Sequence, residues 1–313
     1  MTPSSGEKVL VTGASGFLGT FIGRTCSEAG LQLVGLDCVP PSDSTLWREF
    51  HLGFCDAQSL IPALTQSNVK TIFHLAGGSS VPDSVSNPAR DFQLSVPSTL
   101  AVLTEIIRHC PSAHVIFLSS AAVYGNPESL PISEDYAVAP ISPYGIHKAM
   151  SELALQHYAR VYGLKVSILR VFSAFGPGLR KQLFWDLSRR AYESKARGEG
   201  TLILQGTGHA SRDFIFASDI ANAALHIAKL TNTLGFEIYN IGSGIETKVR
   251  DVACQLIQEL KLDMSVEFDG IERDGVPERW CADITKLRRS GFSPSVPLNV
   301  GIQQLSNWLA TVL

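Results

Sequence analysis

The sequence lacks the features of membrane, metal and nucleic-acid proteins. Its six cysteines are scattered, without a C-x-x-C pair or a histidine cluster, so we expect reduced thiols in a cytoplasmic protein and no metal site. No apolar run reaches membrane-spanning length. Met1–Glu7 has neither the basic nor the apolar region of a signal peptide. A net charge of -3 gives no attraction to nucleic acid or to an anionic membrane.

Short apolar runs alternate with helical patterns through the first half of the chain. This alternation predicts an α/β fold with a doubly wound, Rossmann-type parallel sheet. Ligands of such sheets bind beyond the carboxyl ends of the strands. The expected strands are Val9–Val11, Leu31–Leu36, Val69–Leu75, His114–Leu118 and Lys165–Val171, and the expected helices are Leu18–Ala29, Ala57–Leu64, Ala89–His109 and Tyr144–Tyr162.

The pattern becomes less regular after Arg170. We expect residues 1–172 to form the first domain, with about 212–230 returning to it, and residues 173–313 to form a smaller α/β domain. In this second part the expected helices are Lys181–Lys195, Asp219–Lys229, Arg250–Leu260 and Gly301–Leu313, and the expected strands are Thr201–Leu204, Phe214–Phe216 and Glu237–Ile241.

A glycine-rich turn joins the first strand to the first helix. Gly13, Gly16 and Gly19 are spaced as G-x-x-G-x-x-G. The first glycine permits a tight turn, the second lets a pyrophosphate approach the backbone, and the third lets the helix pack on the strand. Asp37 ends the second strand about 20 residues later, where a carboxylate holds a ribose diol. The same carboxylate would repel a 2′-phosphate, which favours NAD over NADP.

Three polar residues near the fourth strand suggest acid–base chemistry. Tyr144 and Lys148 are spaced i, i+4 and share one helix face, and Ser120 lies just beyond the strand. A tyrosine base at neutral pH needs its pKa lowered by roughly 3 units, or about 4 kcal/mol. One cation about 5 Å away supplies roughly 3 kcal/mol, so we expect Lys148 and a positive nicotinamide together to suffice. Ser120 would hydrogen-bond the reacting oxygen.

The combined motifs resemble the extended short-chain dehydrogenase/reductase family, the NAD-dependent nucleotide-sugar epimerases and dehydratases, and most nearly the UDP-glucose 4-epimerase type. The resemblance runs nearly end to end. It implies NAD as cofactor, a nucleotide sugar bound by the C-terminal part, and a homodimer formed through helices Ala89–His109 and Tyr144–Tyr162. The motifs are T-G-A-S-G-F-L-G at 12–19, Asp37, Asp56, H-L-A-G at 74–77, S-S-A-A-V-Y-G at 119–125, Y-G-I-H-K at 144–148, R-D-F at 212–214 and Y-N-I-G at 239–242.

The resemblance also implies roles for individual residues. The implied catalytic set is Ser120, Tyr144 and Lys148. The implied cofactor contacts are Gly13, Ser15, Gly16, Phe17, Leu18, Gly19, Asp37, Asp56, Leu75, Ala76, Gly77, Ser119, Tyr144, Lys148 and Val171. The implied substrate contacts are Ser79, Ser80, Ser120, Ser173, Gln182, Arg212, Arg273 and Trp280. A large ring at Trp280 would favour a hexose without an acetylated C2 substituent.

The residues after Ser120 help to choose among the family's reactions. Family dehydratases carry Asp-Glu there, whereas this chain has Ala121 and Ala122, and methyl groups cannot exchange protons. What remains resembles the family's 4-epimerases, so the resemblance implies 4-epimerisation in sugar-nucleotide or surface-polysaccharide metabolism. A 4-keto-sugar reductase using exchangeable NAD(P)H and a non-catalytic dinucleotide sensor are the alternatives. Ser173 stands where the family usually has Asn. The sequence leaves the nucleotide base and the sugar of the substrate open. We expect His147 to serve packing and Asp219 to cap its own helix.

Overall fold

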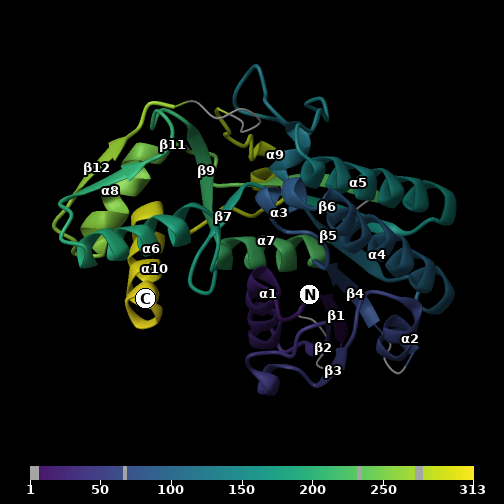
Figure 1. Ribbon diagram of the computed structural model, residues 1–313. Helices are drawn as coiled ribbons and strands as arrows, with labels where there is room; N and C mark the ends of the chain where they lie inside the picture. Colours follow the sequence, from purple (N-terminus) through teal and green to yellow (C-terminus); the bar gives the residue numbers. More distant parts are fainter. Residues whose placement is uncertain (1–6, 66–68, 231–234, 272–277) are drawn as a thin grey trace.

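A seven-stranded parallel sheet forms the centre of the computed structural model, which describes residues 7–65, 69–230, 235–271 and 278–313 (Figure 1). The strand order is β10-β6-β5-β4-β1-β2-β3 and every neighbouring pair is parallel. This is the expected doubly wound arrangement. The strands are β1 (Lys8–Thr12), β2 (Gln32–Asp37), β3 (Glu49–Leu52), β4 (Val69–His74), β5 (His114–Ser120), β6 (Lys165–Val171) and β10 (Phe236–Ile241).

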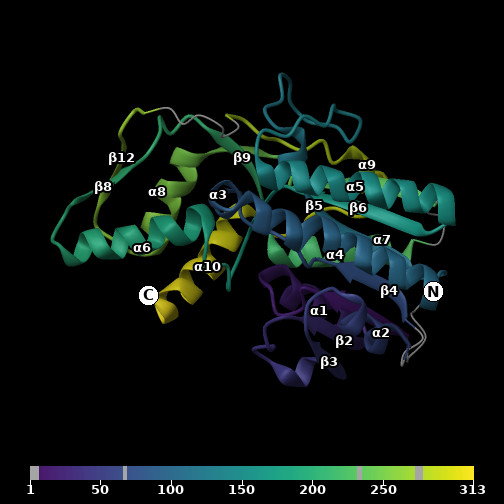
Figure 2. The same cartoon turned by 45° about the vertical axis from the view of Figure 1, so that its right-hand side comes forward.

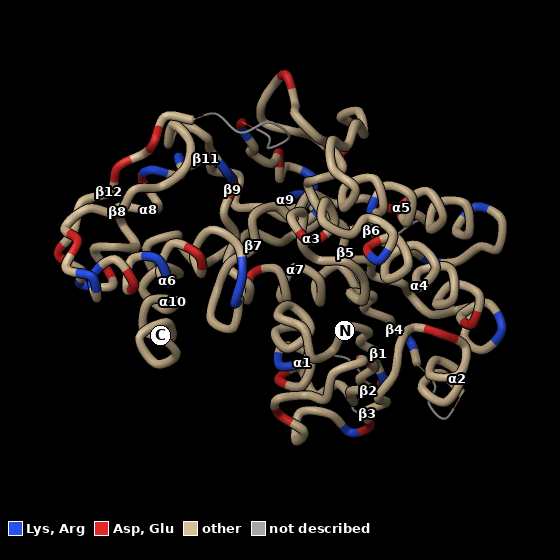
Figure 3. The backbone as a smooth tube through the Cα atoms, viewed as in Figure 1, with Lys and Arg blue, Asp and Glu red and all other residues tan. Residues whose placement is uncertain are grey.

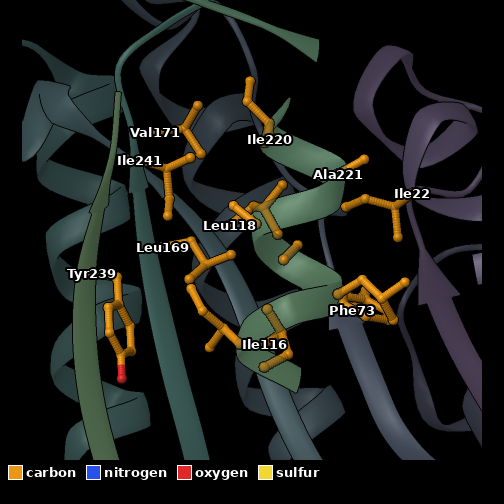
Figure 4. Packing of buried hydrophobic residues seen from close by; sticks show 14 of the residues in the cluster. Ile22, Phe73, Ile116, Leu118, Leu169, Val171, Ile220, Ala221, Tyr239 and Ile241 are labelled. Atoms are coloured by element: carbon orange, nitrogen blue, oxygen red, sulfur yellow. The ribbon is translucent and has the colours of Figure 1, made fainter. Parts of the chain in front are cut away.

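Helices cover both faces of this sheet. Alternate residues of β1 point to opposite faces: Val9 and Val11 join one buried cluster and Leu10 joins another. The first cluster packs under α1 (Phe17–Glu28) and α7 (Ala217–Lys229), and Ile22 of α1 and Ala221 of α7 point toward each other (Figure 4). The second packs under α2 (Ala57–Thr65), α4 (Pro88–His109) and α5 (Pro143–Tyr162). Burial on both faces explains why the strands read as continuous apolar runs.

A second, smaller assembly lies on the left in Figure 1. Its phenylalanine-rich core includes Phe175, Phe184 and Phe214. Figure 2 shows its elements from another side. The helices are α6 (Gln182–Ala196), α8 (Val249–Glu259) and α10 (Leu298–Val312). The strands are β7 (Ser173–Phe175), β8 (Thr201–Leu204), β9 (Ser211–Phe216), β11 (Glu246–Lys248) and β12 (Ser265–Phe268).

Three short helices complete the list of elements near the sheet, namely α3 (Val81–Ser86), α9 (Thr285–Arg289) and the 3-10 turn η2 (Ala121–Tyr124). A further 3-10 turn, η1, covers Ser44–Leu46. α7 packs against α1 although it follows β9 in the chain, and β10 joins the edge of the large sheet. The division at residue 172, with a return at about 212–230, stays a prediction.

The capping role expected for Asp219 is wrong. α7 begins at Ala217 after Phe216 and has no side-chain cap. The buried Asp219 carboxylate instead accepts hydrogen bonds from the backbone N–H groups of Ser295 and Val296. It therefore ties the segment before α10 to the first turn of α7, a contact between residues far apart in sequence.

Acidic and basic residues are scattered over both assemblies (Figure 3). In the described ranges, no helix combines the length and apolar character needed to cross a bilayer. Nor do the residues placed by the structure include a group of three or more His, Cys, Asp or Glu suited to a metal ion.

Candidate active site

The glycine-rich turn between β1 and α1 lies so close to other backbone atoms that side chains at its glycines would collide with them. Gly13 has φ +71°, and a Cβ there would lie 2.8 Å from Ala76 N. A Cβ on Gly19 would lie 2.1 Å from Gly13 O, inside the contact between helix and loop. Gly16 precedes α1, whose first turn has no side-chain cap, so its free N–H groups are available to an anion. These features fit the pyrophosphate of a dinucleotide such as NAD. Ser15, Phe17 and Leu18 complete this segment.

Asp37 lies beside this turn at the carboxyl end of β2. Its Oδ2 accepts from Ser15 N at 2.9 Å and its Oδ1 from Val39 N at 3.1 Å. The carboxylate is thereby fixed where the sequence pattern expects it to meet a ribose. Asp56 is exposed, and its Oδ1 accepts from Ser59 N at 2.9 Å in the first turn of α2.

The ends of β4, β5 and β6 supply the next predicted contacts. Leu75, Ala76 and Gly77 directly follow β4, and Gly77 has φ +148°. Val171 is the buried last residue of β6. The Ser119 hydroxyl donates its proton to Glu152 of α5, so toward a cofactor this hydroxyl could only accept.

Ser120, Tyr144 and Lys148 come together at the end of β5. The Ser120 side chain hydrogen-bonds the Tyr144 phenol. Lys148 Nζ lies 5.9 Å from the centre of the Tyr144 ring and donates to Leu118 O at 2.9 Å. Ser142 caps α5 by accepting from Gly145 N at 3.2 Å, so the first turn of α5 presents Tyr144 to the strand end.

Burial works against the lowered Tyr144 pKa that we expect from Lys148 and a positive nicotinamide together. Burial, aided by the Asp91 charge, raises the pKa of Tyr144 to about 12 against the hydrogen bond from Ser120. Burial also lowers the pKa of Lys148 to about 8, although Asp91 and Glu152 oppose this. Desolvation therefore sets the direction of both shifts, against the Ser120 hydrogen bond for Tyr144 and against the Asp91 and Glu152 charges for Lys148. A further positive charge beside the phenol is required before Tyr144 can act as a base near neutral pH.

The predicted substrate residues lie on two sides of this centre. Ser79 and Ser80 precede α3, and Ser80 Oγ accepts from Asp83 N at 3.3 Å. Ser173 opens β7, and the exposed Gln182 opens α6 with φ +65°. Arg273 lies outside the described residues.

Arg212 and Trp280 approach the other end of the turn that begins at Ser120. The Arg212 guanidinium lies 5.5 Å from the centre of the Trp280 ring. Trp280 Nε1 donates to Gly125 O at 2.9 Å, directly after η2. Burial lowers the pKa of Arg212 to about 10, so its charge would gain from an anion at this place.

Sequence reasoning missed two groups near the site. Lys181 Nζ donates to Ser79 Oγ at 2.6 Å and links α6 to the Ser79 loop. His147, expected only to pack, is hydrogen-bonded through Nδ1 to Asp91 Oδ2 at 2.5 Å. His147 lies inside the Y-G-I-H-K motif, but an isolated aspartate in a helix gives no sequence pattern by which to find Asp91.

A parallel Rossmann-type sheet with this glycine turn and Tyr/Lys pair defines a dinucleotide-dependent enzyme of the short-chain dehydrogenase/reductase type. The chain belongs to the NAD dependent epimerase/dehydratase family, whose model matches residues 9–242. NAD is accordingly its cofactor.

Named relatives match over nearly the whole chain. A UDP-glucose 4-epimerase of Mycolicibacterium smegmatis is 31% identical over 94% of this chain and 96% of its own. A putative UDP-glucose 4-epimerase of Methanocaldococcus jannaschii is 29% identical over 96% and 98% of the two chains. Among solved structures, MoeE5 in complex with UDP-glucuronic acid and NAD superposes with a TM-score of 0.87, at 29% identity over 98% of this chain and 100% of MoeE5.

Proposed function

We propose that this enzyme epimerises a nucleotide-activated hexose at C4, in the manner of UDP-glucose and UDP-galactose interconversion. The observation that carries the proposal is the composition of the β5 end. Ser120, Tyr144 and Lys148 converge there, while the adjoining Ala121 and Ala122 are buried methyl groups. The site can remove and return one hydroxyl proton, but it has no carboxylic acid at these positions for elimination. The relatives named above support the same reaction.

Tyr144, Ser120 and Lys148 have different roles in this reaction. Bound NAD supplies a reversible hydride acceptor for C4 and a positive charge. Tyr144 takes the proton of the 4-hydroxyl and later returns it to the 4-keto oxygen, because its own pKa falls when positive charge adjoins the phenol. Ser120 hydrogen-bonds the same sugar oxygen. Lys148 adds its ammonium charge from beneath the Tyr144 ring.

The test is turnover of UDP-, GDP-, CDP- and dTDP-hexoses by purified protein without added cofactor. We expect one of these sugars to be converted to its C4 epimer. Tyr144→Phe should lose at least about a thousandfold in kcat while retaining NAD, since the ring keeps its packing and loses only the hydroxyl. Near-full activity of this variant would contradict the mechanism.

The alternative is a 4-keto-sugar reductase, and the open question is whether cofactor exchanges. A reductase would consume NAD(P)H in amounts equal to product, whereas an epimerase returns each hydride to its own substrate. Stoichiometric loss of NAD(P)H absorbance with a 4-keto sugar, and no epimerisation, would favour the reductase.

We also propose that two copies pair through α4 and α5, in a cytoplasmic enzyme serving sugar-nucleotide or polysaccharide metabolism. Exposed Ile146, Met150 and Leu153 recur at i, i+4 and i+7 along α5, which is an apolar stripe suited to a helix partner. Leu153→Glu should give monomers in sedimentation velocity. Leu52→Glu, at a side chain with the same 67% exposure on β3, should leave the association unchanged.

A further inference from the structure

Residues 176–181, which connect β7 to α6, lie against the cofactor turn. A Cβ on Gly176 would lie 3.6 Å from Cζ of Phe17, and a Cβ on Gly178 would lie 3.8 Å from Cδ2 of the same ring. Phe17 is the first residue of α1, and the N-terminus of this helix fits the pyrophosphate of NAD. The segment 176–181, which we call the strap, therefore runs beside the anion site of the cofactor.

The strap ends at the loop that follows the neighbouring strand. Lys181 Nζ donates to Ser79 Oγ at 2.6 Å and to Ser79 O at 3.0 Å. Ser79 follows β4 and Phe17 follows β1, and these two strands pair in the sheet. The loops after them lie close together, because a Cβ on Gly13 would be 2.8 Å from Ala76 N. The strap consequently spans the carboxyl edge of β1 and β4, where ligands of a parallel sheet bind.

Further contacts hold the strap on the smaller assembly. The exposed Arg180 guanidinium lies 5.6 Å from the centre of the Trp185 ring and 5.8 Å from that of Trp308. Leu179 is buried, and its N–H donates to Gly176 O at 3.3 Å, which makes the strap a tight turn. The strap is thus fixed to α6 and α10, and Lys181 ties it to the Ser79 loop.

Lys181 brings a positive charge to this edge. The turn at 12–19, T-G-A-S-G-F-L-G, contains no lysine or arginine. Both oxygens that accept from Lys181 are uncharged, and an ammonium group has a third N–H to donate. Among the residues that the structure describes, Lys181 has no carboxylate within the 4.0 Å of an ion pair. Burial lowers the pKa of Lys181 against the charge of Asp83, so the ammonium would gain from an adjoining anion.

We propose that Lys181 is a further cofactor-binding residue, which offers its ammonium group to the pyrophosphate of NAD and holds the strap over it through Ser79. NAD then leaves the site slowly, because the hydrogen bonds between Lys181 and Ser79 must break first. The inference concerns the retention of the cofactor and does not depend on which reaction the enzyme catalyses.

The experiment measures the release of NAD. Protein loaded with 14C-labelled NAD is mixed with an excess of unlabelled NAD, and the bound label is followed by rapid gel filtration. Lys181→Met should release NAD at least about tenfold faster than wild type, because it loses charged hydrogen bonds. Lys181→Arg should restore much of the slow release, since it keeps the charge and can still donate to Ser79. Ser79→Ala, which keeps the ammonium and loses one acceptor, should fall between wild type and Lys181→Met.

The matched control is Lys195→Met, because Lys195 is exposed in the last turn of α6 and its loss changes the net charge equally. It should leave the release rate unchanged. Lys181→Gln is the second neutral variant should Lys181→Met not fold. Release from a folded, neutral Lys181 variant at the wild-type rate would overturn the proposal, and so would equal acceleration by Lys195→Met. Slow release that depends on Lys181, in a protein that epimerises no nucleotide sugar, would count against the proposed function alone.

Discussion

His74 Nδ1 lies 2.7 Å from Thr12 Oγ1, and its Nε2 lies 3.1 Å from Thr99 Oγ1. Both nitrogens of this fully buried imidazole thus meet hydroxyl groups, which can donate as well as accept. Burial, together with the charge of Lys148, lowers the pKa of His74 to about 3. A neutral histidine therefore bridges β1, β4 and α4 next to the cofactor turn.

This histidine should make the protein sensitive to acid. The unfolded chain binds a proton at His74 below a pH of about 6.5, whereas the folded chain does so only near the lowered value. Stability should fall as pH decreases through this window, by up to about 1.4 kcal/mol per pH unit. In urea unfolding between pH 4 and 7, His74→Gln should show a shallower loss than wild type. The exposed His209→Gln should not, and equal slopes for all three proteins would contradict this assignment.

The closeness of α1 to its own entry turn gives a second prediction. In Gly19→Ala the new Cβ would lie 2.1 Å from Gly13 O and 2.9 Å from Ala14 O. Because these are backbone atoms, the helix must shift, at a cost of about 2 kcal/mol or more. We expect reduced stability and at least about a tenfold loss of NAD affinity. Gly200→Ala, with open space around its Cβ, is the control, and a Gly19→Ala protein that retains NAD as wild type does would argue against the site.

The buried ion pair of Arg170 and Glu152 gives a third prediction. Arg170→Met leaves the Glu152 charge buried without its cation, which typically costs about 3–5 kcal/mol. Adding Glu152→Gln should recover much of that loss, because the uncompensated charge is gone. The matched surface pair is Arg197 with Glu199, and Arg197→Met should change the free energy of unfolding little, because water screens an exposed ion pair. Similar losses from both arginines would show that burial is not the cause.

The central sheet was predictable because its strands are buried on both faces. Each expected strand of the first half lies within a residue or two of its observed bounds, for example Lys165–Val171 as β6. The short strands could not be predicted in this way. For example, β3 (Glu49–Leu52) lies at the sheet edge, has half-buried and exposed residues, and shows no apolar run. β11 and β12 were missed for the same reason, since their residues alternate between half-buried and exposed.

The site was predictable as a set of residues but not as an electrostatic system. The spacing of Tyr144 and Lys148 predicted their common helix face. The structure brings Tyr144 to Ser120 and places Lys148 Nζ 5.9 Å from the centre of the Tyr144 ring. Their depth cannot be read from spacing, so the cost of burying a phenolate and an ammonium was underestimated. The Asp91 carboxylate arrives from α4, and only tertiary packing reveals it.

Arg212 gives the last prediction. Burying its positive charge costs more free energy when no anionic ligand is bound than when one is. The guanidinium donates to the carbonyl oxygens of Ser211 and Glu278, and its pKa is lowered by burial alone. Arg212→Met should therefore leave the free enzyme as stable as wild type or more so, since an apolar chain replaces a poorly solvated cation beside Trp280. A diphosphate would supply the missing negative charge, so the same variant should raise KM for the nucleotide sugar at least about tenfold with a smaller change in kcat. Arg212→Lys should recover part of the affinity, because a lysine keeps the charge but loses the two-pronged geometry. Calorimetric titration with the free nucleoside diphosphate separates this role from catalysis, and unchanged binding by Arg212→Met would remove Arg212 from the substrate site.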